Sequence, residues 1–153
     1  MRYTMTLLIL ILTTLSAGTV VHAAEPGLEK FITGFDYVTR KDMKIDSKEL
    51  IKLLKEGKAQ LIDIRFREEN ATWKVNPSLS IPLNELPQRL NEIDKSKIVV
   101  TACPHKDRAA IAMVYLRSKG IPARYLTDGL IGMMENLRGD NARDLVDALA
   151  THK

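Results

Sequence analysis

The segment from Lys97 to Gly120, KIVVTACPHKDRAAIAMVYLRSKG, decides the fold that the sequence predicts. Its first part, Ile98 to Ala102, is a short apolar run rich in β-branched residues, which is typical of a strand buried on both faces. From Asp107 onward the apolar residues recur with helical spacing, and Gly120 is suited to end that helix. The turn between strand and helix therefore lies at the carboxyl end of a buried strand, where open α/β sheets bind their ligands.

Cys103, the only cysteine of the chain, begins this turn. Backbone N–H groups at the start of a helix have no partner within the helix, and the helix dipole makes that end partially positive. Lys106 and Arg108 add positive charge, which favours the thiolate form of a nearby cysteine. The same groups would receive a small anion. We therefore predict that Cys103 is a catalytic nucleophile, with substrate bound by the loop residues Pro104, His105, Lys106, Asp107 and Arg108.

A Cys-x-x-x-x-Arg loop between a buried strand and an Ala-rich helix resembles the active-site loop of rhodanese-type sulfurtransferases. Three further segments resemble that family in the same order. Leu61 to Arg65 is similar to its strand ending in Asp-x-Arg, Ser80 to Leu83 to its Asn-Ile-Pro-Leu segment, and Ala123 to Gly129 to its last strand and Gly-Gly turn. The resemblance covers roughly residues 43–139. The loop departs from the family pattern in having no glycine, and Pro104 removes one N–H donor.

The resemblance implies an α/β rhodanese-like fold, with a central parallel sheet of about five strands and helices on both faces, as the alternating strand and helix patterns also favour. It implies that Cys103 takes sulfane sulfur from thiosulfate or a polysulfide, forms a persulfide, and passes the sulfur to a thiol, sulfide or cyanide. No cofactor is expected. The three histidines, His22, His105 and His152, are far apart in sequence and do not suggest a metal site.

Two other functions stay open. The same loop would serve a non-enzymatic sulfur carrier or binding module that hands sulfur to a partner. Cysteine phosphatases have a similar loop, but with five residues between Cys and Arg, whereas four intervene here. The shorter loop fits one sulfur atom better than a phosphoryl group.

Asp63 and Arg65 end the preceding buried strand, Ala59 to Ile64, at the edge where Cys103 is also expected. They could support the site directly. We favour the simpler interpretation that they form an ion pair that fixes the geometry of the loop.

Residues 1–23 are interpreted as a signal peptide, because Arg2 is followed by an apolar run and Val21-His22-Ala23 fits a signal-peptidase site. Cleavage would leave a periplasmic or secreted protein without stable membrane insertion. A lone cysteine cannot form an internal disulfide in such an oxidising compartment, which favours a functional thiol. The predicted organisation continues with an N-terminal arm at 24–42, the rhodanese-like domain at 43–139 and a helical extension at 140–153.

The remaining pattern gives coarser predictions. The segment 25–40 has no clear period and is expected to be irregular, and 66–78 is expected to be a long connection. Asp46 is expected to cap one helix, residues 84–93 to form another, and Asn141 to cap the last. The net charge of +4 comes from scattered basic residues and does not suggest a nucleic-acid partner. The sequence predicts no particular oligomeric state.

Overall fold

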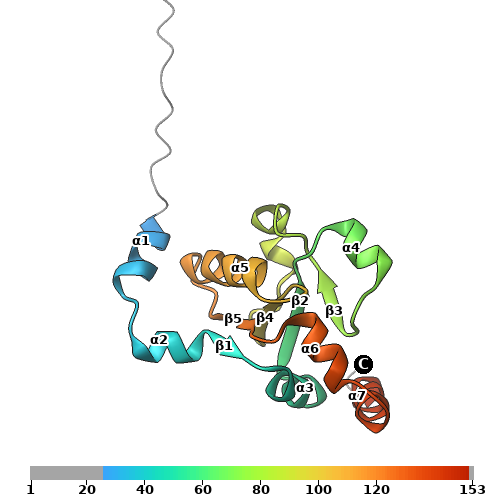
Figure 1. Cartoon of the computed structure of the whole chain (residues 1–153). Helices are drawn as coiled ribbons and strands as arrows, with labels where there is room; N and C mark the ends of the chain where they lie inside the picture. The colour runs from blue at the N-terminus through green and yellow to red at the C-terminus, as the bar shows by residue number, and fades with distance from the viewer. Residues whose placement is uncertain (1–25, 152–153) are drawn as a thin grey trace, which may run out of the picture.

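The computed structural model describes residues 26–151 and contains one parallel sheet with helices on both faces (Figure 1). The predicted α/β fold class is confirmed. The predicted signal peptide lies outside the described residues. Five strands lie in the order β1-β5-β4-β2-β3, and their bounds are β1 Lys44–Ile45, β2 Ala59–Asp63, β3 Ser78–Ser80, β4 Ile98–Ala102 and β5 Ala123–Leu126.

Three helices cover one face of the sheet and one long helix covers the other. The first group comprises α3 (Ser47–Lys55), α6 (Gly129–Asn136) and α7 (Asp140–Thr151), and α5 (Asp107–Ser118) packs on the opposite face. The carboxylate of Asp46 accepts the N–H of Glu49 at 2.9 Å, which confirms the predicted cap of α3. None of the helices between residues 26 and 151 has the length and hydropathy needed to cross a membrane.

The alternation of side chains along β4 determines on which face of the sheet the Cys103 loop begins. Val100 and Ala102 face the core beneath α3 and α6, whereas Val99 and Cys103 belong to the core beneath α5. Cys103 therefore leaves the sheet on the same side as the start of α5, the helix that follows it in sequence.

The N-terminal arm is not irregular, so this prediction is wrong. It forms α1 (Pro26–Thr33) and α2 (Tyr37–Asp42), and α1 packs against α5. The approach is very close at Gly27, where an added Cβ would lie 2.0 Å from the carbonyl oxygen of Ser118. Asp36 caps α2 by accepting the N–H of Thr39 at 2.7 Å. A tertiary contact and a local cap thus impose helix where the apolar pattern is weak.

Three other local predictions are corrected. Residues 84–93 form two short 3₁₀ helices, η1 (Leu86–Gln88) and η2 (Leu90–Glu92), in place of one continuous α-helix. The connection 66–78 contains α4 (Arg67–Thr72), in which Glu69 accepts the N–H of Phe66 at 3.1 Å. The last helix begins one residue before Asn141, at Asp140.

Candidate active site at the Cys103 loop

Cys103 lies just beyond the carboxyl end of β4, beside the end of β2. Its side chain is only 2% exposed and belongs to the apolar cluster beneath α5. The thiol thus sits at the base of the loop, deeper than the polar residues that follow it would suggest. His105, Lys106 and Asp107 are exposed above it.

The loop is held from both sides. On the α5 side, the hydroxyl of Thr101 donates to the carbonyl of Ala109 at 2.8 Å. On the α6 side, the N–H of Leu130 donates to the carbonyl of Cys103 at 2.9 Å, and the N–H of Ile131 donates to the carbonyl of Pro104 at 3.3 Å. The first turn of α6 therefore occupies two carbonyl groups of the loop. The N–H groups of the loop are not used in these contacts.

The amide groups of the loop form the feature that best suits an anion. The first backbone N–H of α5 with a partner is that of Ala110, which donates to Lys106 at 2.9 Å. Within residues 26–151, the N–H groups of residues 105–109 have no hydrogen-bond partner. Five unpaired donors at the positive end of a 12-residue helix make the turn directly after the cysteine suited to an anion. Pro104 contributes no donor.

Arg108 is fixed by a residue that the sequence did not indicate, Glu69 of α4. Two of its nitrogens donate to the Glu69 carboxylate at 2.6 and 2.8 Å, and its guanidinium lies 5.7 Å from the Phe66 ring. The hydrogen bond to Glu69 raises the pKa of Arg108, and the nearby Cys103 sulfur adds to that effect. The sequence offers one signal for this pair, the acidic Glu68-Glu69 doublet within the segment predicted to be a connection.

This pairing changes the charge balance expected for the loop. Glu69 offsets Arg108, and the exposed Asp107 carboxylate is next to Lys106, which has no ion-pair partner among the described residues. The positive charges of Arg108 and Lys106 are therefore largely balanced by the negative charges of Glu69 and Asp107. The unpaired amides, with Lys106 above them, account for the attraction of an anion better than the formal charge of the loop does.

Asp63 and Arg65 form the predicted ion pair. Arg65 Nη2 lies 2.6 Å from Asp63 Oδ2, and both side chains are fully buried. The same Arg65 nitrogen donates to the carbonyl of Trp73 at 2.8 Å, its guanidinium lies 3.8 Å from the Trp73 ring centroid, and Asn70 donates to Asp63 at 2.8 Å. The pair thus braces the segment that carries α4 and, through α4, the position of Glu69. Among the described residues, neither Asp63 nor Arg65 forms a hydrogen bond or ion pair with Cys103, although the register of β2 and β4 places Asp63 beside Ala102.

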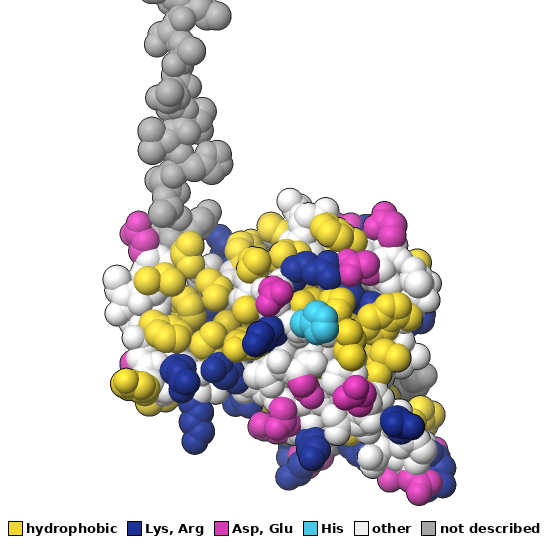
Figure 2. Space-filling model, viewed as in Figure 1, with side chains coloured by type: hydrophobic (Ala, Val, Ile, Leu, Met, Phe, Trp, Pro, Cys, Tyr) yellow, Lys and Arg dark blue, Asp and Glu magenta, His cyan; other side chains and the backbone are white. Residues whose placement is uncertain are grey.

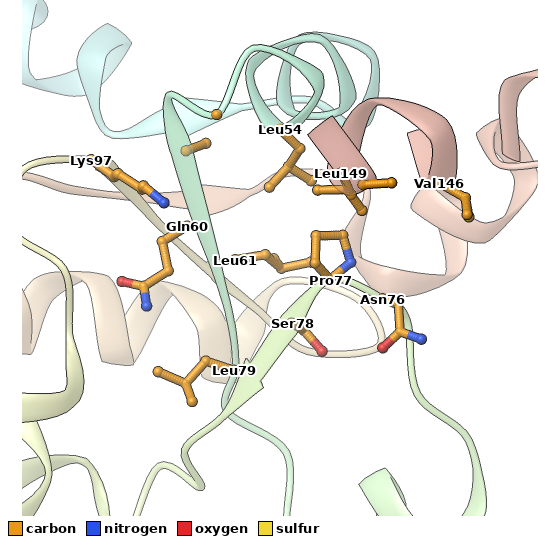
Figure 3. Close-up of a pocket in the computed structure, with 13 residues that line it drawn as sticks. Leu54, Gln60, Leu61, Asn76, Pro77, Ser78, Leu79, Lys97, Val146 and Leu149 are labelled. Atoms are coloured by element: carbon orange, nitrogen blue, oxygen red, sulfur yellow. The ribbon is translucent and has the colours of Figure 1, made fainter. Parts of the chain in front are cut away.

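A groove of about 760 Å³ lies at the other end of the sheet (Figure 3). Its labelled lining includes Leu54 of α3, Leu61 of β2 and Val146 and Leu149 of α7, near the amino ends of β2 and β3. Because Cys103 follows the carboxyl end of β4, this groove is separate from the Cys103 loop. No cluster of three or more His, Cys, Asp or Glu side chains suited to a metal occurs within residues 26–151.

The contact between α6 and the loop gives a first prediction. Gly129 has φ +67°, and an added Cβ would lie 2.2 Å from the carbonyl oxygen of His105 and 2.3 Å from that of Pro104. Gly129→Ala should therefore displace the loop as well as strain the backbone, lowering the free energy of unfolding by more than the ~1–2 kcal/mol typical of a positive φ alone. Gly120→Ala is the control, since Gly120 has φ +78° and open space around it. Equal losses for the two variants in urea unfolding would contradict the contact.

The Arg108–Glu69 pair gives a second prediction. If the activity implied by the resemblance is assayed as thiocyanate formation from thiosulfate and cyanide, Glu69→Gln should lower kcat/KM about tenfold, because a two-pronged charged contact that orients Arg108 is lost. Glu85→Gln is the matched control, since Glu85 also accepts from arginines, Arg67 and Arg89, but outside the site. Similar kinetic losses in both variants would mean that Glu69 has no particular role at the loop.

The pair also has a defined pH dependence. The hydrogen bond from Arg108 lowers the pKa of Glu69 to about 2, below the ordinary value of 4.5. A carboxylate with a lowered pKa stabilises the folded state above its ordinary pKa, and that contribution is lost as the pH falls through about 2. The orientation of Arg108 should therefore not titrate between pH 5 and 8, which the pH profile of the Glu69→Gln to wild-type rate ratio will check. A ratio that changes with pH in this range would contradict it.

Comparison with known proteins agrees with this fold. Residues 46–136 match the model of the rhodanese-like domain, and the chain belongs to the rhodanese-like family. A protein named sulfurtransferase from Allochromatium vinosum is 32% identical over 97 residues, covering 63% of this chain and 81% of that protein. An uncharacterized protein of Bacillus subtilis, YqhL, is 38% identical over 72 residues, or 47% of this chain, which spans only 57% of that relative.

Solved structures give the same result for the fold. The human single-domain sulfurtransferase TSTD1 superposes with a TM-score of 0.54 at 30% identity, covering 61% of this chain and 96% of that one. A rhodanese-like domain protein from Staphylococcus aureus has a TM-score of 0.55 at 31% identity, covering 59% of this chain and 89% of that one. The family match begins at residue 46, so α1 and α2 lie outside it.

Proposed function

We propose that this protein is a sulfurtransferase that moves sulfane sulfur from thiosulfate or a polysulfide to a thiophilic acceptor through a persulfide on Cys103. The observation that carries the proposal is the position of the one cysteine, at the start of a turn whose N–H groups at 105–109 have no partner among the described residues. Family membership and the similarity to a protein named sulfurtransferase support the class of reaction.

The first half-reaction follows from this arrangement. The Cys103 thiolate attacks the outer sulfur of the donor, the S–S bond of thiosulfate breaks, and sulfite leaves with the bonding electron pair. The product is a persulfide whose terminal sulfur carries the negative charge. Unpaired amides of the turn and the fixed Arg108 are the donors available to stabilise that charge. No general base is required when the thiol is already ionised.

The second half-reaction regenerates the Cys103 thiolate. A nucleophilic acceptor attacks the terminal sulfur, the S–S bond to Cys103 breaks, and its electron pair stays on the Cys103 sulfur. With cyanide as acceptor the product is thiocyanate. His105, exposed at the loop, is assigned no proton transfer in either step.

Steady-state thiocyanate formation from thiosulfate and cyanide tests the proposal. Turnover in the wild type is the expected result. A persulfide that forms but is not turned over by cyanide, sulfide or a small thiol would instead favour a sulfur carrier. Hydrolysis of p-nitrophenyl phosphate without thiocyanate formation would favour a phosphatase and overturn the proposal.

We further propose that the protein is exported, with residues 1–23 removed, and works in the periplasm or outside the cell. The support is the apolar run followed by Val21-His22-Ala23. Amino-terminal sequencing of the protein recovered from its native host tests this, and the expected first residue is Ala24. Recovery of the chain from the cytoplasm with residues 1–23 attached would contradict it.

A further inference from the structure

Four large apolar side chains surround the Cys103 loop while remaining in contact with water. Phe66, Ile111, Ile131 and Met134 are 52%, 59%, 41% and 48% exposed, and we call this set the apolar collar. In Figure 2 hydrophobic side chains lie beside the cyan histidine, and His105 is the one histidine of the described chain. Large exposed apolar side chains gathered at one place on a soluble domain mark an interaction site.

Each member of the collar is tied to the loop by the fold. The Phe66 ring lies 5.7 Å from the guanidinium of Arg108, and the backbone N–H of Ile131 donates to Pro104. Ile111 is one turn along α5 from Asp107, and Met134 is one turn along α6 from Ile131. The collar therefore comes from three elements, α5, α6 and the segment before α4, and lies on different sides of the loop.

A shallow groove extends the collar on the α6 side. It measures about 510 Å³ and is lined by Trp73, Ile131 and Met134, with Glu135 and Arg138 at its polar edge. The charges near the loop are mixed, with Lys106 next to Asp107 and Arg138 near Glu135. The surface thus favours a body that is apolar and has little net charge.

These features suit the two substrates of the proposed reaction differently. The inference rests on that proposed function. A small dianion such as thiosulfate interacts with the amides of residues 105–109 and gains nothing from exposed aliphatic and aromatic side chains. Phe and Met are enriched at protein interfaces, where burying them contributes binding energy. The collar is therefore suited to the acceptor, which must bring a nucleophile to the persulfide.

We propose that the acceptor is a cysteine on a protein segment whose neighbouring side chains are apolar and pack on the collar. In the transfer step the acceptor thiolate attacks the terminal sulfur of the Cys103 persulfide. The bond between that sulfur and the Cys103 sulfur breaks, and the electron pair remains on Cys103. The acceptor leaves as a persulfide, so that no additional oxidant or reductant is needed.

Two pentapeptides blocked at both ends test the proposal. One has phenylalanine and the other serine on each side of a central cysteine, so that the two thiols are chemically similar. With the thiosulfate-loaded protein, kcat/KM is expected to be about tenfold higher for the phenylalanine peptide, because burying one apolar side chain on the collar is sufficient for that factor. Equal values for the two peptides, with normal thiocyanate formation, would overturn this inference and leave the proposed function standing.

Variants locate the effect. Met134→Ser and Ile111→Ser should each lower the ratio of the phenylalanine-peptide rate to the serine-peptide rate about threefold. Each peptide rate is also compared with the rate that the same variant gives with cyanide. Val146→Ser is the matched control, since Val146 is 64% exposed but lies on α7 at the groove of Figure 3. An equal change in Val146→Ser would contradict the assignment. So would sedimentation that shows a wild-type dimer and a Met134→Ser monomer, since a second copy would then occupy the collar. Loss of thiocyanate formation in the wild type would instead count against the proposed function.

Discussion

Replacing Cys103 with serine is expected to abolish sulfur transfer, reducing thiocyanate formation by on the order of a thousandfold or more. A serine hydroxyl is a far weaker nucleophile toward sulfur and forms no persulfide. The side chain is 2% exposed, so serine also places a hydroxyl in the apolar cluster beneath α5. Steady-state kinetics with thiosulfate and cyanide measures the loss.

The folded state of this variant must be checked at the same time. Cys103→Ala keeps the cluster apolar and serves as the second variant, with the same expected loss of rate. If both variants remain folded by circular dichroism and either retains a rate within tenfold of the wild type, Cys103 is not the nucleophile.

The largest expected effect on stability is at Arg65. Arg65→Ala should lower the free energy of unfolding by about 3–5 kcal/mol, because it leaves the buried Asp63 carboxylate without its counter-charge. The variant also loses the contacts of Arg65 with the carbonyl and the ring of Trp73. Urea unfolding measures the change.

Two further variants separate this effect from a general loss of arginine. Arg143→Ala removes an exposed arginine that pairs with Asp140 at 3.1 Å, and should change the free energy of unfolding by less than about 1 kcal/mol. Arg65→Lys keeps the charge but not the two-pronged geometry, so it should lie between Arg65→Ala and the wild type. A loss at Arg65 no greater than that at Arg143 would show that the buried pair does not brace the domain.

The sheet and the position of the Cys103 loop could be predicted because their signals are local. Apolar runs such as Ile98 to Ala102 identify buried strands, and the polar segment after Cys103 identifies the turn that follows one. The burial of Cys103 could also have been predicted from the sequence. It has the same strand parity as Val99, and both belong to the core beneath α5.

The parts that could not be predicted depend on contacts between distant segments. Glu69 and Arg108 are 39 residues apart, and nothing in either segment alone indicates that they pair. The helix α1 lies against α5, with Gly27 close to Ser118. Its eight residues are too few for the spacing of the apolar side chains to indicate a helix. The apolar collar likewise joins residues from three elements, so that it exists only in the folded chain.

The most direct test is the intact mass of the purified protein after incubation with thiosulfate. The account predicts a gain of one sulfur, about 32 Da, that is removed by a reductant or by cyanide, maps to the peptide containing Cys103, and is absent from Cys103→Ser. An unchanged mass under conditions in which the thiol is accessible to a small alkylating reagent would contradict the central claim, that this cysteine carries sulfur between donor and acceptor.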